Sequence, residues 1–330
     1  MSFLYPLKFK PVFKEKIWGG NKLNTILGKN LPQNKKIGES WEISGVKDNI
    51  SIVLNGPLAE NNLEELIEIY MGELVGDLVF EKFGIEFPLL IKFIDANNVL
   101  SIQVHPDDEL ARKRHNAFGK TEMWYIIQAD KNSEIITGFK QEIEKEQYQK
   151  YFREGRLTQI LNIEKANTGE VFYIPAGRIH ATGKGILFAE IQQTSDITYR
   201  IYDWERKDKN GNSRELHTEL ALDAIDFNKY DNYKTPYEIT KNQSVSIADC
   251  KYFHTNILDF DKAIEKDYYL IDSFVIIMCI KGRLLIHSKN NKEQVNTGET
   301  VLIPASVNNI IFEPLVDSKI LEVYIGGAKS

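Results

Sequence analysis

One short segment occurs twice in the sequence, and this repeat limits the possible folds more than any other feature. Residues 169–176 read GEVFYIPA, and residues 298–305 read GETVLIPA. In each copy a turn glycine precedes strand-forming residues that end at a proline, and a block rich in Ile, Val and aromatic residues lies upstream. A motif that returns in this way indicates that the chain contains the same supersecondary unit twice.

The remaining sequence predicts a mainly β protein with a few inserted helices. Short runs of Ile, Val, Phe, Tyr and Thr alternate with Gly, Asn and Asp turns, as is typical of a sandwich or barrel. Apolar residues follow helical spacing over 61–74, 141–163 and 213–227, and the segment from Pro106 to Glu109 is typical of a helix start. We expect the helix at 141–163 to be an insertion into the first unit.

Chain length favours two domains. A single core stops growing at about 250 to 300 residues, and this chain has 330. The polar stretch 229–243 lacks periodicity and is the predicted linker. We therefore expect a metal-binding catalytic domain over 1–235 and a second domain without metal over 236–330.

Charge and cysteine content exclude several classes of function. The formal net charge of −6 leaves no basic surplus for a nucleic-acid backbone. No segment is continuously apolar for about 18 residues, and Lys and Pro interrupt the N-terminal stretch, so we expect neither a membrane partner nor export. With only Cys250 and Cys279, any metal site must use His, carboxylate and amide ligands. The expected location is the cytoplasm.

The repeated unit resembles the two half-motifs of a cupin, a small double-sheet jelly roll whose open barrel end holds a metal. We therefore expect two cupin-type jelly-roll barrels. In the segment SIQVHP, strand alternation places Ser101, Gln103 and His105 on one face and the intervening apolar residues on the other. Glu122 precedes the next strand block, and His180 follows the first Ile-Pro-Ala turn, where cupins place a late histidine.

Gln103, His105, Glu122 and His180 together make two nitrogen and two oxygen ligands, which suits Zn²⁺ or another borderline divalent ion. An open position on the ion would let it touch a substrate. In the second copy, Asn309 stands at the place equivalent to His180, so we expect that copy to hold no metal. The other histidines lack a partner pattern, and we interpret them as structural or exposed: His115, His217, His254 and His287.

Several longer segments resemble those of type I phosphomannose isomerases and run in that family's order from Lys16 to Trp204. They are KIWGG, GESWEIS, LSIQVHPDD, GKTEMWYII, PAGRIHA and QTSDITYRIYDW. The weaker C-terminal unit also matches the compact bacterial branch. The chain is shorter than the eukaryotic and enteric enzymes, which leaves less room for a full helical domain.

The resemblance implies a mannose-6-phosphate isomerase that interconverts mannose 6-phosphate and fructose 6-phosphate through an enediol, with one Zn²⁺ per chain. It implies the four ligands given above and a catalytic role for Arg200. Lys120 and Glu190 are both candidates for carrying the proton, and the sequence does not choose between them. Further pocket residues are expected at Ser101, Trp18 and Asp196, and candidates for the phosphate are Arg206 and Lys92.

Two other functions remain open from sequence. One is a non-enzymatic cupin that binds a phosphosugar without moving a proton. The other is a different metal-dependent cupin enzyme such as an iron oxygenase, although that class prefers ligation by imidazoles or by two His and one carboxylate. A phosphosugar is the expected small-molecule partner, and the oligomeric state is left open.

Overall fold

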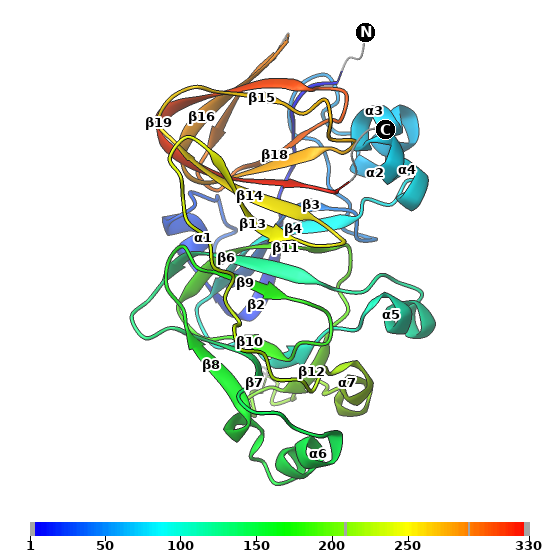
Figure 1. Cartoon of the computed structure of the whole chain (residues 1–330), viewed down its shortest axis with the longest axis vertical. Coiled ribbons are helices and arrows are strands. Elements are labelled where there is room, and N and C mark those ends of the chain that lie inside the picture. Colours follow the sequence, from blue (N-terminus) through cyan, green and yellow to red (C-terminus); the bar gives the residue numbers. More distant parts are fainter. Residues whose placement is uncertain (1–3, 208–209, 290, 327–330) are drawn as a thin grey trace.

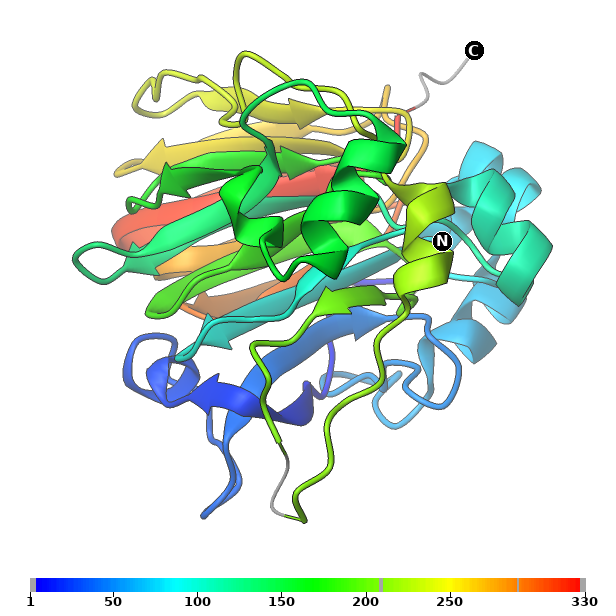
Figure 2. The same cartoon turned by 90° about the horizontal axis from the view of Figure 1, so that it is seen from below.

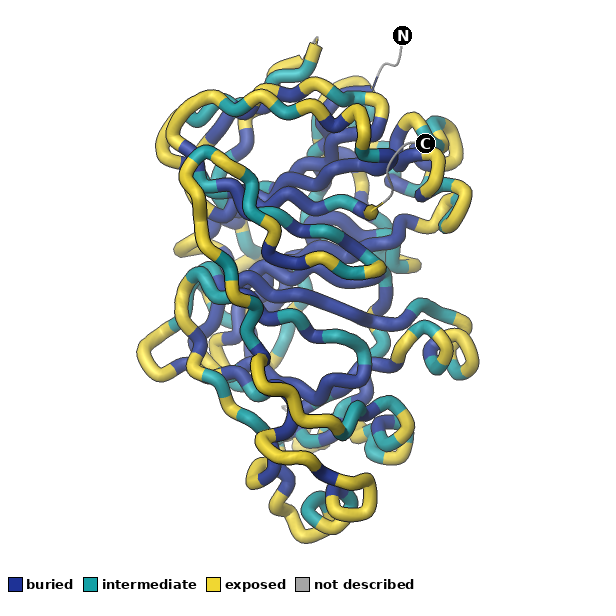
Figure 3. The backbone as a smooth tube through the Cα atoms, in the orientation of Figure 1, coloured by how far each residue is buried: buried dark blue, intermediate teal, exposed yellow. Residues whose placement is uncertain are grey.

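The computed structural model describes residues 4–207, 210–289 and 291–326. Its strands form layered sheets, and the helices lie around their edges (Figure 1). The middle layers are almost entirely buried, whereas helices and loops are largely exposed (Figure 3). The prediction of a mainly β protein is confirmed. Within the described ranges, no helix has the length and apolar character needed to span a membrane.

Two facing antiparallel sheets make up the first half of the chain. The six-stranded sheet has the order β2 (Val12–Gly20), β3 (Ile37–Ser44), β4 (Leu89–Ala96), β11 (Ile186–Gln193), β6 (Glu122–Ala129) and β9 (Val171–Ile174). The five-stranded sheet has the order β12 (Tyr199–Tyr202), β5 (Ile102–Val104), β10 (His180–Thr182), β7 (Glu134–Phe139) and β8 (Leu161–Lys165). Ile126 and Phe172 of the first sheet share one buried cluster with Ile135 of the second.

A single eight-stranded sheet makes up the second half. Its main path is β1 (Leu7–Lys8), β18 (Thr300–Ile303), β16 (Val275–Ser288), β19 (Asn309–Tyr324), β14 (His254–Phe260) and β13 (Ser244–Asp249), with β15 (Ile264–Asp267) on β19 and β17 (Asn291–Asn296) on β16. A cluster of apolar side chains, including Leu284, Ile286 and Phe312, packs together within this half.

The predicted repeat corresponds to the same hairpin in both halves. In the first, β9 pairs with β6; in the second, β18 pairs with β16. The turn glycines also make matching bonds, because Gly169 N–H donates to Ile126 O at 2.8 Å and Gly298 N–H donates to Cys279 O at 2.7 Å. The repeat therefore reflects a shared supersecondary unit, as predicted.

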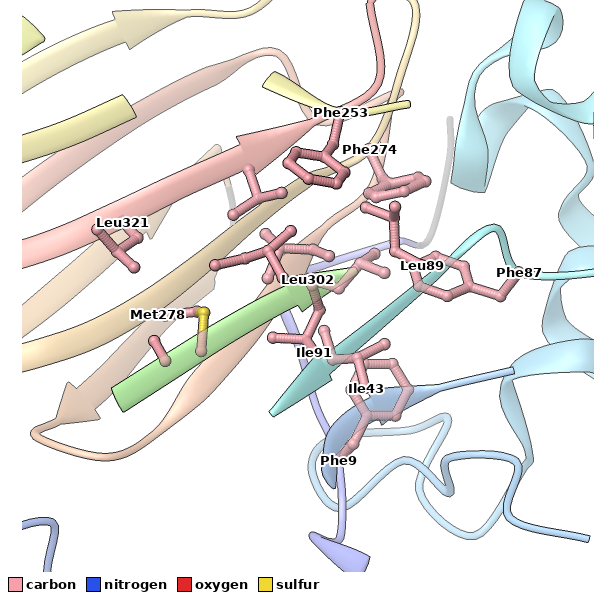
Figure 4. Close-up of a cluster of buried hydrophobic side chains, with 14 of the residues drawn as sticks. Phe9, Ile43, Phe87, Leu89, Ile91, Phe253, Phe274, Met278, Leu302 and Leu321 are labelled. Carbon is pink, nitrogen blue, oxygen red and sulfur yellow. The ribbon is translucent and has the colours of Figure 1, made fainter. Parts of the chain in front are cut away.

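Alternation along the central strands divides their side chains between two interiors. Along β4, Leu89, Ile91 and Phe93 point into a core shared with the second half, whereas Lys92 and Ile94 line a cavity on the opposite face. Figure 4 shows this shared core, in which Leu89 and Ile91 lie among side chains from both halves, including Phe274, Met278, Leu302 and Leu321. Every residue of β4 is buried because both faces of the strand are covered.

The N-terminal segment connects the two halves further. Strand β1 pairs with β18, with Leu7 opposite Leu302, so residues at the start of the chain extend the C-terminal sheet. No local pattern in the sequence indicates this pairing, because the partners are almost 300 residues apart. The division at residues 235 and 236 stays a prediction.

The helices are shorter than the spacing of apolar residues predicts. They are α1 (Lys22–Thr25), α2 (Leu63–Tyr70), α3 (Gly72–Val75), α4 (Asp77–Phe83), α5 (Asp108–His115), α6 (Lys145–Arg153) and α7 (Thr218–Ala224), with a 3₁₀ turn η1 (Leu157–Gln159). Seen from below, the cyan and teal helices α2 to α5 gather at one end of the strands (Figure 2).

Two of the predicted helices end early for local reasons. The helix expected over 61–74 breaks at Met71, whose φ of 46° is incompatible with a right-handed helix. The helix expected over 141–163 ends at Arg153, and residues 161–165 join the sheet as β8 instead. The predicted helix start after Pro106 is confirmed, because the Asp107 side chain accepts a bond from Leu110 N–H and caps α5.

Candidate active site

A polar cavity of about 290 Å³ opens between the two sheets of the first half. Both sheets contribute to its wall, which contains seven of the residues predicted from sequence: Trp18, Ser101, Gln103, Lys120, Glu190, Asp196 and Arg200. Lys92, the further phosphate candidate, also lines it, together with residues that the sequence analysis did not select: Lys16, Glu39, Trp41, Ile94, Leu100, Trp124, Phe188, Thr198 and Arg214.

The predicted metal ligands lie together at this cavity. Cross-strand pairing places His180 of β10 opposite Gln103 of β5, and His105 follows β5 on the same polar face. From the other sheet, Glu122 presents one carboxylate oxygen 3.4 Å from His180 Nε2 and the other 3.6 Å from His105 Nε2. Ligand atoms of the two histidines and Glu122 lie within 4.8 Å of one another and could hold a metal ion.

Hydrogen bonds orient both imidazoles for ligation. His105 Nδ1 lies 2.9 Å from Ile197 O, and His180 Nδ1 lies 2.8 Å from Arg178 O. With each Nδ1 protonated and donating to its carbonyl, each Nε2 keeps a lone pair on the side of Glu122, where Lys120 Nζ contacts His105 and Gln103 Nε2 contacts His180. Burial lowers the pKa of His180 to about 4 and holds the pKa of His105 well below its ordinary value, so both rings are neutral near pH 7.

The surroundings of Glu122 fit a bound cation. Its side chain is fully buried, and no residue in the described ranges forms a hydrogen bond with its Oε1. Its Oε2 accepts a bond of 2.6 Å from Lys120 Nζ, which also lies 2.9 Å from His105 Nε2, so the site already accommodates one positive charge. Burial raises the pKa of Glu122 to about 7, although Lys120 opposes the shift. A buried acceptor without a partner is costly, and a metal ion would satisfy it.

Gln103 completes the predicted ligand set. Its Nε2 lies 3.2 Å from His180 Nε2, so the amide contacts the same cluster. Rotation of the amide by 180° presents Oε1 in place of Nε2, and the two orientations occupy the same space. Two imidazoles, a carboxylate and an amide oxygen form a donor set that can hold a divalent metal ion.

Three lysines of the cavity are each paired with a buried carboxylate. Besides Lys120 with Glu122, Lys92 Nζ lies 2.8 Å from Glu190 Oε1 and Lys16 Nζ lies 2.9 Å from Glu39 Oε1. Sequence reasoning missed Lys16 and Glu39 as site residues, although Lys16 begins the segment KIWGG and Glu39 is the second residue of GESWEIS. The signal was present, but the partner of each residue lay on a different strand.

Glu190 is held as an ionised carboxylate. Burial alone would raise its pKa, but Lys92 and Lys120 outweigh that effect and lower it. Both of its oxygens already accept hydrogen bonds, Oε1 from Lys92 Nζ at 2.8 Å and Oε2 from Trp124 Nε1 at 2.9 Å. Such a carboxylate is a weak base and a strong electrostatic anchor.

Trp18 and Arg200 reach the cavity from opposite walls. The Trp18 ring packs so closely over Gly38 that a Cβ there would lie 2.4 Å from the ring, which explains the need for glycine at the start of GESWEIS. Arg200 lies on β12 opposite Gln103, and its Nη1 donates to Glu215 O at 2.8 Å. The Arg200 Nε is buried and lacks a hydrogen-bond partner.

Arg206 does not line the cavity. Its guanidinium donates to Asp203 and to the carbonyl oxygens of Val99 and Asp203. The remaining histidines have other partners, consistent with their interpretation as structural or exposed: His115 contacts Tyr199, His217 contacts the backbone of Arg200, His254 contacts Asp249 and His287 contacts Glu313.

Comparisons with known proteins agree on one family. A family model described as phosphomannose isomerase type I, catalytic domain, matches residues 6–143. The chain is 35% identical to the mannose-6-phosphate isomerase ManA of Bacillus subtilis, over 93% of this chain and 96% of that protein. It is 41% identical to the mannose-6-phosphate isomerase of Streptococcus mutans, over 68% of this chain and 69% of that protein.

Solved structures agree with the sequence comparisons. The mannose 6-phosphate isomerase of Bacillus subtilis matches with a TM-score of 0.87 at 34% identity, covering 97% of this chain and 99% of that one. A phosphomannose isomerase variant from Salmonella typhimurium shares the fold, with a TM-score of 0.81 at 15% identity over 98% of this chain and 100% of that one. The prediction of a mainly β, cupin-type fold with few helices is confirmed. On identity and coverage together, this chain belongs to the type I phosphomannose isomerase family.

Proposed function

We propose that this protein is a mannose-6-phosphate isomerase, an enzyme that interconverts mannose 6-phosphate and fructose 6-phosphate through an enediol. The observation that carries the proposal is the buried cluster of His105, Glu122 and His180 beside a polar cavity between the two sheets. The relatives that cover most of the chain have the same activity in their names. The phosphosugar is the proposed partner, and the cytoplasm is the proposed location.

Gln103, His105, Glu122 and His180 are the residues that would hold one Zn²⁺ per chain. The neutral imidazoles, the partnerless Glu122 oxygen and the adjacent amide support this assignment. When bound, zinc supplies a Lewis acid that polarises substrate oxygens without any redox change. The carbonyl oxygens of Ile197 and Arg178, bonded to the Nδ1 atoms of His105 and His180, keep both rings oriented before substrate arrives.

The isomerisation requires one side chain to move a proton between C1 and C2. Contacts in the cavity favour Lys120 Nζ over Glu190 as this carrier, because both Glu190 oxygens already accept bonds from Lys92 and Trp124. Glu190 then acts as a fixed negative charge that positions the lysines. Exchange of solvent deuterium into C2 of the substrate distinguishes the two roles. We expect Lys120→Met to abolish this exchange and Glu190→Gln only to slow it.

Other cavity residues bind and orient the open sugar chain. The buried Arg200 Nε has no hydrogen-bond partner among the described residues and can donate to a substrate oxygen that gains negative charge. Ser101 and Asp196 offer hydroxyl and carboxylate groups to sugar hydroxyls, and Trp18 supplies an apolar wall. Arg206 acts on the substrate only indirectly, through its contact with Asp203.

A coupled assay tests the function and the metal centre together. Purified protein loaded with zinc is incubated with mannose 6-phosphate, and fructose 6-phosphate is followed. We expect turnover that chelation removes and zinc restores, and that is absent in His180→Ala. The matched control is His287→Ala, which removes a histidine paired with Glu313 on the second half and should retain turnover. A folded, zinc-loaded wild-type protein without turnover would instead support a sugar-binding cupin.

A further inference from the structure

Positive charge in the cavity is balanced everywhere except along one edge. Lys16, Lys92 and Lys120 each contact a carboxylate within 2.9 Å, so none of them offers an unopposed charge. The arginines beside β12 differ. Arg200 donates to a backbone carbonyl and, within the described part of the chain, forms no ion pair with a carboxylate, while Arg206 and Arg214 both pair with the single carboxylate of Asp203.

This arginine edge, made of Arg200, Arg206 and Arg214, is built by a return of the chain along β12. His217 N–H donates to Arg200 O at 2.7 Å, and Arg200 N–H donates to His217 Nδ1 at 3.1 Å. The Arg200 side chain donates to Glu215 O. These three bonds fix the segment from Arg214 to His217 against the edge strand of the sheet, and they place Arg214 beside Arg200 in the cavity wall.

Asp203 sets the direction of the Arg214 guanidinium. Its Oδ2 accepts a bond of 2.8 Å from Arg214 Nε, and its Oδ1 is shared by Arg214 and Arg206. Asp203 is 6% exposed, whereas the Arg214 side chain is 31% exposed and lines the cavity. Arg214 therefore keeps donors free toward the opening, while Arg206 turns away from it.

We infer that Arg214, positioned by Asp203, binds the phosphate group of the substrate. The inference rests on the proposed function for its substrate class. An arginine fork matches the geometry of phosphate oxygens and makes paired, charge-assisted hydrogen bonds that a sugar hydroxyl cannot replace. A dianion here would also relieve repulsion between the arginines, which, after burial, is the next largest cause of the lowered pKa of Arg200.

The location fits the chemistry of a hexose 6-phosphate. Arg200, Gln103 and His180 lie side by side on β12, β5 and β10. Adjacent strands are about 4.8 Å apart, so the arginine edge lies about 10 Å or more across the sheet from the His180 strand. The segment that carries Arg214 bonds the outer side of β12, about two strand spacings from the Gln103 strand. The phosphate is carried on C6, at the far end of the sugar from the carbons that exchange the proton, so a site set back from the metal cluster suits it.

Calorimetric titration tests this assignment without requiring turnover. Zinc-loaded wild type, Arg214→Gln and Arg206→Gln are titrated with fructose 6-phosphate and with fructose. We expect Arg214→Gln to weaken binding of fructose 6-phosphate by about 10- to 100-fold, as for loss of charged hydrogen bonds, and to leave fructose binding unchanged. Arg206→Gln removes the same charge from the same edge and should weaken it by about fivefold at most.

Three results would overturn the inference. The first is that Arg214→Gln binds fructose 6-phosphate as tightly as wild type does. The second is that it binds fructose 6-phosphate and fructose more weakly by the same factor. The third is that Arg206→Gln weakens binding of fructose 6-phosphate as much as Arg214→Gln does. If Arg214→Gln does not fold, Arg214→Lys keeps the charge without the fork and should still weaken fructose 6-phosphate selectively. Wild-type isomerisation of mannose 6-phosphate is measured separately, so failure of the proposed function is distinguishable from failure of the phosphate assignment.

Discussion

Replacing Glu122 with Gln should stabilise the metal-free protein and abolish its response to zinc. Burial raises the pKa of Glu122 from 4.5 to about 7. The folded chain therefore binds this proton more tightly than the unfolded chain, so stability is lost as pH rises from about 4.5 to about 7 and stays lost above that range. The difference corresponds to about 3 kcal/mol at about 1.36 kcal/mol per pH unit, which Glu122→Gln should recover at pH 8.

Urea unfolding in chelator and in zinc measures both effects. In chelator the free energy of unfolding of the variant should exceed that of wild type by only about 1 kcal/mol at pH 5, where wild-type Glu122 is largely protonated in the folded chain. Zinc at 100 times its Kd should add about 2.7 kcal/mol to wild type and nothing to the variant. A variant that is less stable than wild type in chelator at pH 8, or equally stabilised by zinc, would refute the reasoning.

Glu42→Gln is the matched control for this experiment. Glu42 is also a buried carboxylate, but both of its oxygens lie 2.6 Å from Lys29 Nζ and it lies outside the metal cluster. Its replacement takes from Lys29 Nζ the carboxylate that it contacts through both oxygens, which should cost about 3 to 5 kcal/mol, whereas Lys120 keeps its contact with His105 Nε2 at 2.9 Å when Glu122 is replaced. The stabilisation by zinc should persist. The two substitutions therefore change stability in opposite directions although each removes one buried negative charge.

Three further predictions concern stability. Burial would raise the pKa of Glu39, but Lys92 and Lys16 outweigh it and lower the pKa to about 2. The free energy of unfolding of wild type should therefore exceed that of Glu39→Gln by about 3 kcal/mol above pH 5. This difference should disappear as the pH falls from about 4.5 toward 2. Urea titrations across this range check it, and a margin independent of pH would contradict it. Leu302→Ala, in the core shared by both halves, should lower the free energy of unfolding by about 2 to 5 kcal/mol. In calorimetry both halves should still unfold in one transition, at a lower temperature; two separate transitions would argue against the shared core. Met71→Gly should gain about 0.5 to 1 kcal/mol in urea unfolding, because it relieves the positive φ of a side chain that is 51% exposed; a loss of stability would show that the Met71 backbone is not strained.

Strand alternation explains how much of the site the sequence could predict. The polar face of Ser101, Gln103 and His105 is a local property, because successive side chains of a strand point to opposite sides. The structure places all three at the cavity or its metal cluster, with Ile102 and Val104 in a separate apolar core. Glu122 and His180 join them, although their roles as ligands stay predictions until metal binding is measured.

The residues that sequence reasoning missed depend on pairing between distant segments. Lys16 and Glu39 become site residues because β2 and β3 form one wall of the cavity, and Arg214 does so because its segment returns along β12. Arg206 and Arg214 are both single arginines in a polar loop, and nothing local distinguishes them. Both pair with Asp203, and only the folded chain shows that Arg214 lines the cavity while Arg206 does not.

The sequence by itself determined the mainly β class, the repeated hairpin and the polar strand face that carries the candidate ligands. All three follow from periodicity and turn chemistry within a few residues. Only the tertiary structure decided the addition of β1 to the C-terminal sheet, the core shared by both halves and the pairing of Lys92 with Glu190. The physical reason is that these contacts join residues far apart in the chain, whose register is set by the packing of whole sheets.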